Sequence, residues 1–322
     1  MASRRRKRNQ LKRYAYHTLT GCFGRCIAPG VECPSEPIRA HSVQREGPLR
    51  RVSADGHVIM LRQRIDLDRG PTYDFAPVGV NKATVFTGLC REHDQRLFTA
   101  IDRQPLNRAD AEQLFLYAYR AVLRETHVSI ESAAKLQAVY QEKCRLGLTD
   151  PNVPTSADMF AVDRMVRAYE TWLYKEMCDE ALVARRYDDL VYDCIDLGET
   201  PPCIAVSSLF SIDEVQVGDD VARVALTVLD GEDDHAYGLL AYLRRDSTQA
   251  REWLEPLLRN TLKSQRYLLS RLILERCDNI VISPTVFATW SPQKREIIRD
   301  FWASTVLRNE NKFDDDRLDL FE

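Results

Sequence analysis

The chain has 322 residues, 44% of them hydrophobic and 29% charged, which is ample for a buried core and too long for one ordinary domain. No run of about eighteen apolar residues is present, which excludes a transmembrane helix, and nine scattered cysteines favour a reduced cytoplasmic protein over a disulfide-bonded secreted one. The net charge of −3 hides an asymmetry: residues 1–110 hold 20 Lys and Arg against 11 Asp and Glu, whereas residues 111–322 hold 25 against 37.

The chain opens with a basic arm, residues 1–19. A block of this kind attracts phosphate backbones by releasing counterions, without reading base sequence. We therefore expect contact with DNA or RNA, while a solvated, disordered tail would have the same composition. The expected nucleic-acid contacts are Arg4, Arg5, Arg6, Lys7, Arg8, Lys12 and Arg13.

Residues 20–105 are rich in Gly, Pro, Cys and His and carry short strand patterns. The apolar positions of residues 43–61 predict a β-hairpin, with Asp55-Gly56 at its turn. Residues 91–102 then predict a short helix with its apolar side chains on one face.

Residues 106–187 predict a helical region. A first helix begins after Asp110 as its cap, a second covers residues 131–148, and a third, long helix begins after two prolines with Ser156 as its cap. The third helix has an apolar stripe that we expect to lie in the core. Its members are Met159, Val162, Met165, Val166, Tyr169, Trp172, Leu173 and Met177.

Residues 188–312 predict an α/β domain. Four strand patterns, a helix over 248–276 that Pro256 begins or kinks, a short strand at 279–284 and a helix starting at Ser291-Pro292 follow in order. The acidic turn at 230–235 is either a cation site or a solvated hairpin turn. Residues 313–322 predict a mobile acidic tail. The expected fold class is α+β, with a small zinc-bound treble-clef module, a helical middle region and a mainly antiparallel C-terminal sheet.

Cysteine and histidine spacing in residues 20–105 indicates a metal site. Cys90 and His93 start a predicted helix, whose first turn aims both side chains at one point and favours a thiolate. Cys26 and Cys33 enclose a Pro-Gly turn and are the preferred second pair, with Cys22 as a competitor. We therefore predict a structural Zn²⁺ site from Cys26, Cys33, Cys90 and His93, against the alternative of unconnected buried thiols.

The order of knuckle, hairpin and ligand-bearing helix resembles a treble-clef finger, and "IRAHSVQ" with "LCREHD" resembles the HNH, or ββα-metal, endonuclease module. The resemblance covers residues 20–105. It implies that His41 is the general base and that Asp94 binds a catalytic Mg²⁺ or Mn²⁺ ion. The chain departs from the family at Ala40, where a metal-binding Asp or His is expected; His57 and Asp74 are candidates to complete that site.

Two functions follow from this resemblance. The first is a metal-dependent endonuclease. The alternative is a non-catalytic zinc module that binds nucleic acid or protein, fused to a partner-binding C-terminal half. Bacterial proteins that join such modules to other domains often act in phage defence, and by this association we expect such a role here. The tail residues Leu318, Leu320 and Phe321 also resemble the motif by which bacterial proteins bind the sliding clamp.

Overall fold

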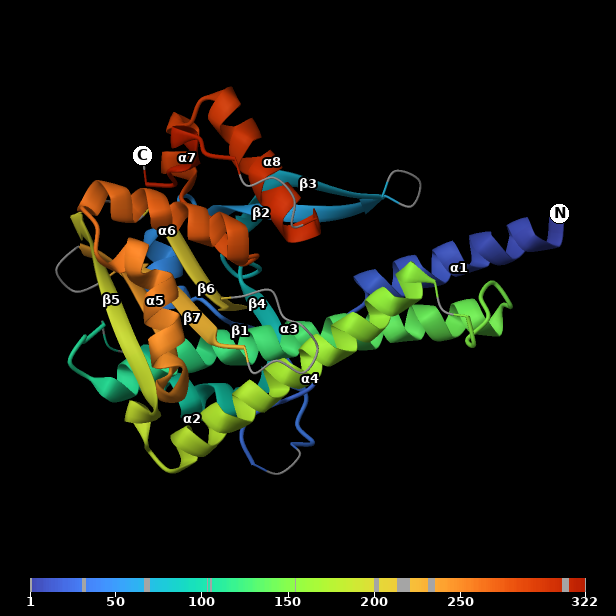
Figure 1. Cartoon of the computed structure of the whole chain (residues 1–322), viewed down its shortest axis with the longest axis horizontal. Helices are drawn as coiled ribbons and strands as arrows, with labels where there is room; N and C mark the ends of the chain where they lie inside the picture. The colour runs from blue at the N-terminus through green and yellow to red at the C-terminus, as the bar shows by residue number, and fades with distance from the viewer. Residues whose placement is uncertain are drawn as a thin grey trace.

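The computed structural model describes residues 2–30, 33–66, 70–102, 104, 106–153, 155–199, 203–212, 221–230, 235–308 and 313–321 (Figure 1). The helices are α1 (Ala2–Thr20), α2 (Arg91–Asp102), α3 (Ala111–Arg145), α4 (Ser156–Val183), α5 (Ser247–Leu258), α6 (Leu262–Arg276), α7 (Pro284–Thr289) and α8 (Pro292–Arg308). The strands are β1 (Pro37–His41), β2 (His57–Asp66), β3 (Gly70–Gly79), β4 (Val85–Cys90), β5 (Leu190–Glu199), β6 (Ile204–Ser211), β7 (Arg223–Asp230), β8 (His235–Leu243) and β9 (Ile280–Ile282).

A seven-stranded sheet forms the centre of the molecule, in the order β3-β2-β9-β6-β7-β8-β5. Each described strand pair in it is antiparallel. Alternate side chains of a strand enter different cores: Leu226 of β7 joins one cluster of buried residues, and its neighbour Ala225 joins the other. The predicted class, α+β with a helical middle region and a mainly antiparallel sheet, is confirmed.

Helices cover both faces of this sheet. The first half of α3 packs against β6, β7 and β8, whereas α6 packs against β5, and α8 against β3. The predicted helix over 248–276 is two helices, α5 and α6, separated after Leu258; Pro256 lies inside α5. At α8, the backbone N–H of Lys294 donates to Ser291 Oγ at 3.1 Å, which confirms the predicted cap. The acidic turn predicted at 230–235 lies mostly outside the described residues.

The predicted hairpin over residues 43–61 is wrong in its first strand. Residues Arg45–Leu49 form a short helical turn instead, and β2 pairs with β3, a strand that was not expected. The turn itself is present: Asp55 and Gly56 have φ of 51° and 70°, and Ala54 bridges to His57. Pro48 and Gly47 disfavour a regular strand before the turn. As a result, the β2–β3 hairpin joins the central sheet, and strands from both sides of residue 105 share it.

A small second sheet lies beside the central one. It pairs β1 with β4 antiparallel, from Pro37 opposite Cys90 to His41 opposite Val85. Helix α2 follows β4 without a gap. The buried Asn279 connects this region to the large sheet, because its Nδ2 donates to Ser42 Oγ at 2.8 Å and to the carbonyl of Ser207 at 3.0 Å.

Helix α1, the C-terminal half of α3 and the N-terminal half of α4 extend from the body, and we call them the three-helix projection (Figure 1). Asp110 caps α3 as predicted, accepting from the N–H groups of Glu112 and Gln113 at 3.0 and 3.2 Å. The two helices predicted over residues 107–148 form one continuous helix, which ends at Arg145 and is followed by Gly147 with φ of 63°.

The cap of α4 differs from the prediction by one residue. Thr155, rather than Ser156, forms a capping box with Asp158. Lys143 of α3 bonds the same Asp158 carboxylate at 2.7 Å and is the leading cause that lowers its pKa. The pair ties the ends of α3 and α4 together.

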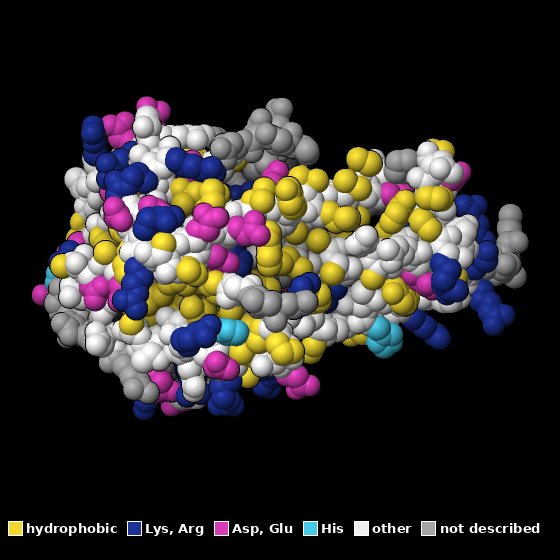
Figure 2. All heavy atoms as spheres, turned by 90° about the horizontal axis from the view of Figure 1, so that it is seen from below, with side chains coloured by type: hydrophobic (Ala, Val, Ile, Leu, Met, Phe, Trp, Pro, Cys, Tyr) yellow, Lys and Arg dark blue, Asp and Glu magenta, His cyan; other side chains and the backbone are white. Residues whose placement is uncertain are grey.

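The apolar stripe of α4 was expected to lie in the core, and this prediction is wrong for five of its eight members, whereas Trp172 and Met177 do pack against the core. Tyr169 is 64% exposed and Met159 51%, and Val162, Met165 and Leu173 are exposed as well. The buried positions of this helix include small residues, among them Ala161, Ala168 and Ala181, so that α4 can pack closely on its neighbours. Figure 2 shows hydrophobic side chains along the three-helix projection and Lys and Arg side chains at its far end.

The predicted mobile tail also differs from the structure. Leu318 and Leu320 are fully buried in the core that α5, α6 and α8 cover, and the N–H of Leu320 donates to Ser270 Oγ at 2.9 Å. None of the described helices has the length and apolar character needed to cross a membrane.

His127 of α3 is a buried histidine whose two ring nitrogens lack hydrogen-bond partners. It packs against the rings of Phe23 and Phe86. Burial is the leading cause that lowers its pKa from the ordinary 6.5. The imidazole of His127 therefore binds a proton more readily in the unfolded chain than in the folded protein. The free energy of unfolding is highest above about pH 6.5 and falls as the pH drops below that value.

We predict that His127→Leu removes this pH dependence. The difference in unfolding free energy between variant and wild type should grow as pH falls from 7.5 to 5.5, by up to about 1.4 kcal/mol per pH unit. Urea denaturation at several pH values measures it, with the exposed His17→Leu as the control. A difference in unfolding free energy that does not change with pH would show that His127 is protonated as easily in the folded protein as in the unfolded chain, and would contradict the prediction.

Candidate metal centre

Two segments distant in sequence supply the candidate metal ligands. Residues 22–28 run extended along β4, with the N–H of Arg25 bonded to the carbonyl of Thr87 and that of Ile27 to the carbonyl of Gly88. This ladder places Cys26 beside the end of β4, where Cys90 is the last strand residue. His93 lies in the first turn of α2, as its sequence position predicts.

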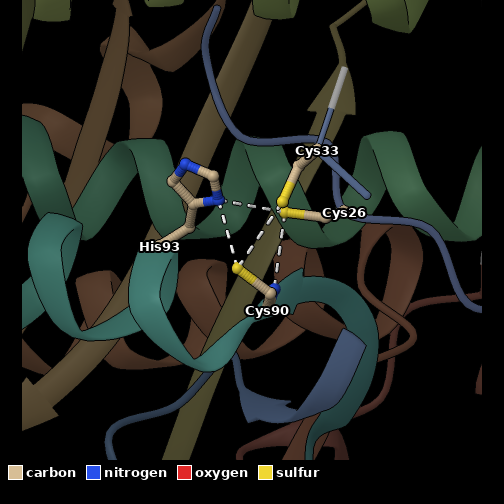
Figure 3. Close-up of side chains that lie close together, drawn as sticks. All are labelled: Cys26, Cys33, Cys90 and His93. Carbon is tan, nitrogen blue, oxygen red and sulfur yellow. Dashed lines mark hydrogen bonds between the residues drawn. The ribbon is translucent and has the colours of Figure 1, made fainter. Parts of the chain in front are cut away.

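The four predicted ligands converge on one point (Figure 3). One ligand atom from each of Cys26, Cys33, Cys90 and His93 lies within 4.8 Å of all the others. His93 Nδ1 is 3.2 Å from Cys90 Sγ and 3.4 Å from Cys26 Sγ, and the Sγ atoms of Cys33 and Cys90 are 3.8 Å apart. Cys22, the predicted competitor, is exposed and is not a member of the group.

These separations fit a tetrahedral zinc ion. With Zn–S bonds of about 2.3 Å and Zn–N bonds of about 2.0 Å, such a site has edges of about 3.8 Å between sulfurs and about 3.5 Å between sulfur and nitrogen. The observed 3.8, 3.4 and 3.2 Å are close to those edges. Three soft thiolates with one imidazole, and no carboxylate among the four, suit Zn²⁺ rather than Mg²⁺ or Ca²⁺.

The surroundings of the thiols favour metal binding. Cys90 is 2% exposed and Cys26 is 8% exposed, in a core shared with α2 and α3. Burial raises the pKa of the Cys26 thiol, whereas the backbone N–H of Ser35 lowers the pKa of Cys33. The N–H of Cys90 also donates to Cys26 Sγ at 3.4 Å, a bond that stabilises a thiolate. A bound cation would compensate the burial of Cys26 and complete the site.

Gly88, in the strand before Cys90, permits this close packing. A Cβ atom at this position would lie 2.8 Å from the ring of Phe86 and 3.1 Å from the Cβ of His127. Any side chain would therefore push β4 away from α3, and with it Cys90. The close packing of β4 against α3 therefore requires glycine at position 88, just before "LC" in the sequence.

Asp94 directly follows His93, whereas His41, the other residue to which the resemblance assigns catalysis, lies opposite Val85 at the far end of the β1–β4 pair. His41 ends β1, and its Nε2 is 3.0 Å from the carbonyl of Val80. Burial lowers the pKa of His41 and raises that of Asp94. The Arg120–Asp102 ion pair, 2.8 Å long, acts electrostatically on both.

Within the described residues, the other expected members of a catalytic metal site form no group of three or more ligands with Asp94. Ala40 is 2% exposed and packs in the core. His57 lies at the turn before β2, where its Nδ1 is 2.9 Å from the carbonyl of Asp55, and Asp74 lies on β3 opposite Arg62. Among the described residues, the only group of three or more potential ligands is the one around Cys90.

Sequence reasoning missed the polar groups that surround His41 and Asp94. Arg120 is 3% exposed, lies 4.0 Å above the ring of Phe98, and belongs to the first half of α3. Tyr117, one turn earlier, is 3.5 Å from Gln44, and burial raises its pKa to about 12. One feature of the sequence could have indicated these groups, namely an arginine within the apolar run "LFLYAYRAVL". A cation in a buried helix segment needs an anionic or hydrogen-bonding partner.

Comparisons of the chain with protein-family models, with curated proteins and with solved structures found no match.

We predict that the purified protein contains about one Zn²⁺ per chain and that Cys90→Ser loses it. Because the ion connects residues 26–33 to α2, its loss should lower the melting temperature by on the order of 5–10 °C. Elemental mass spectrometry and thermal melting measure both effects. Cys22→Ser is the matched control and should keep the metal; equal zinc in both variants would contradict the assignment.

Proposed function

We propose that this chain is a zinc-braced nucleic-acid-binding protein that contacts the phosphate backbone through α1. The observation that carries the proposal is the exposure of this helix. All seven of its Lys and Arg side chains are exposed, and the helix contains no acidic residue. Such a surface binds phosphates by counterion release.

Helix α1 is held in a defined position, which supports a binding surface over a loose tail. It packs on α3, and Lys135 Nζ donates to the carbonyls of Leu19 and Gly21 at 3.3 and 2.7 Å. A lysine at this place also complements the negative end of the helix dipole. The metal centre lies a few residues farther on, so zinc would fix the base from which α1 extends.

The remaining charge of the chain favours one orientation on nucleic acid. Residues 111–322 hold 25 Lys and Arg against 37 Asp and Glu. This acidic excess repels phosphates, and α1 attracts them. The polyanion is therefore expected at the far end of the three-helix projection, where Figure 2 shows Lys and Arg side chains together.

The second candidate function is phosphodiester cleavage with His41 as the general base. The order β1, β4, α2 and the place of His41 at the end of β1 favour this HNH-like interpretation. Its low pKa also keeps the imidazole neutral and able to accept a proton near pH 7. We rank it second because Ala40 is buried in the core and because, among the described residues, Asp94 belongs to no group of three or more potential ligands that could bind Mg²⁺ or Mn²⁺.

Salt-dependent binding tests the proposal. Fluorescence anisotropy with a labelled DNA or RNA oligomer should give an affinity that falls steeply with salt. On duplex DNA, Arg5→Gln/Arg8→Gln should reduce the salt slope by about 0.9 for each phosphate that the variant no longer neutralises. The matched control, Arg259→Gln/Lys263→Gln on the α5–α6 turn, should leave it unchanged. Absence of binding at low salt would contradict the proposal.

A cleavage assay separates the two candidates. The wild-type protein should bind an oligonucleotide in the presence of Mg²⁺ or Mn²⁺ without cutting it. Cleavage that disappears in His41→Ala, while zinc content and binding persist, would replace the first candidate with the second. Cleavage that survives in His41→Ala would indicate a contaminating nuclease.

A further inference from the structure

A polar cleft lies between helices α3 and α4 and one end of the central strands β6 and β7, and none of the four candidate metal ligands lines it. Its volume is about 430 Å³, within the range of small-molecule pockets. Helices α3 and α4 form one wall, and the end of β6, the start of β7 and the end of α6 form the other. Four arginine side chains reach it: Arg164, Arg167, Arg223 and Arg276.

Two of these arginines have carboxylate partners. Arg167 pairs with Asp163 at 3.0 Å. Arg223, which is 9% exposed, pairs with Glu170 at 3.3 Å and also donates to Thr171 Oγ1 at 3.2 Å. Their charges are therefore compensated within the protein.

The other two arginines have no carboxylate partner among the described residues. Arg164 lies over the ring of Phe160 at 4.7 Å, and its pKa is lowered first by burial and next by the neighbouring Arg167. Arg276 has a buried Nε atom without a hydrogen-bond partner. Removing a guanidinium group from water without an anionic partner is unfavourable. A negatively charged ligand in the cleft would therefore stabilise both side chains.

The acids that line the cleft do not supply that charge. Asp278 accepts two hydrogen bonds from Arg124, at 2.5 and 3.1 Å, and Glu275 pairs with Arg271 at 3.3 Å. Glu125 forms an ion pair with Arg124 at 2.9 Å, and burial raises the pKa of this carboxyl group. Among the residues that the structure describes, no carboxylate forms an ion pair with Arg164 or Arg276, although Asp163 and Glu125 act on Arg164 electrostatically.

We propose that this cleft binds the phosphate monoester group of a small ligand. A phosphate monoester carries about −1.5 to −2 charges at pH 7, which matches two guanidinium groups, and Arg164 of α4 and Arg276 of α6 both line the cleft. Ser129, Ser132 and Ser211 add hydroxyl donors for its oxygens. Val128, Leu209 and Phe210 provide an apolar wall for the organic part.

Calorimetric titration with inorganic phosphate and with adenosine 5′-monophosphate tests the proposal, with adenosine as the uncharged control. Both phosphates should bind the wild-type protein and adenosine should not. Arg164→Gln and Arg276→Gln should each weaken binding by about tenfold or more, because each removes one charge-assisted hydrogen-bond donor. Arg259→Gln, which changes an exposed arginine outside the cleft, should bind like wild type.

Several outcomes would overturn this assignment. They are no binding of either phosphate, equal binding of adenosine, or unchanged affinity in both cleft variants. Arg5→Gln/Arg8→Gln should keep phosphate binding, so loss in that variant would place the anion on α1 instead. Thermal melting confirms that each variant is folded before titration. A tighter Kd for the nucleotide than for inorganic phosphate would identify a phosphorylated organic molecule as the ligand.

Discussion

The convergence of three thiols and one imidazole is the constraint on which the N-terminal part of this molecule depends. Cys26 and Cys90 are 64 residues apart in the chain, and the contact between them closes a loop that contains β1 and the whole β2–β3 hairpin. Closing such a loop costs conformational entropy, and Zn²⁺ coordination by this cluster would offset that cost. The small β1–β4 sheet has too few strands to be stable alone, so its position follows from the metal centre and the helices that cover it.

This centre links the two large parts of the structure. On one side, residues 22–28 lead back to α1, whose end is bonded by Lys135 of α3. On the other side, the β2–β3 hairpin leaves the small sheet and adds two strands to the large one, beside β9. The segment that carries the three cysteines and His93 is therefore connected directly to the seven-stranded sheet. A metal-dependent change in residues 22–33 would reach both the basic helix and the sheet through these covalent connections.

The sequence predicted the metal ligands and most helices and strands, because their signals are local. Spacing around Cys90 identifies a ligand pair, and Asp110 and Ser291 mark helix starts by their own chemistry. The failures depend on tertiary contacts. The strand β3 has no strong alternation, and its partner β2 was assigned to another hairpin. The apolar stripe of α4 was predicted to be buried and is largely exposed, whereas Leu318 and Leu320 were predicted to be mobile and are buried. Hydrophobicity alone does not say which side chains a neighbouring element covers. Arg120 and the cleft arginines come from distant elements and meet only in the fold.

X-ray absorption at the zinc edge of the purified protein tests the metal centre most directly. We predict a four-coordinate ion with three sulfur ligands at about 2.3 Å and one nitrogen ligand at about 2.0 Å. Cys33→Ser should reduce the sulfur count to two or abolish binding. A shell of four sulfurs, a six-coordinate oxygen shell, or the absence of zinc from protein prepared without chelators would contradict it.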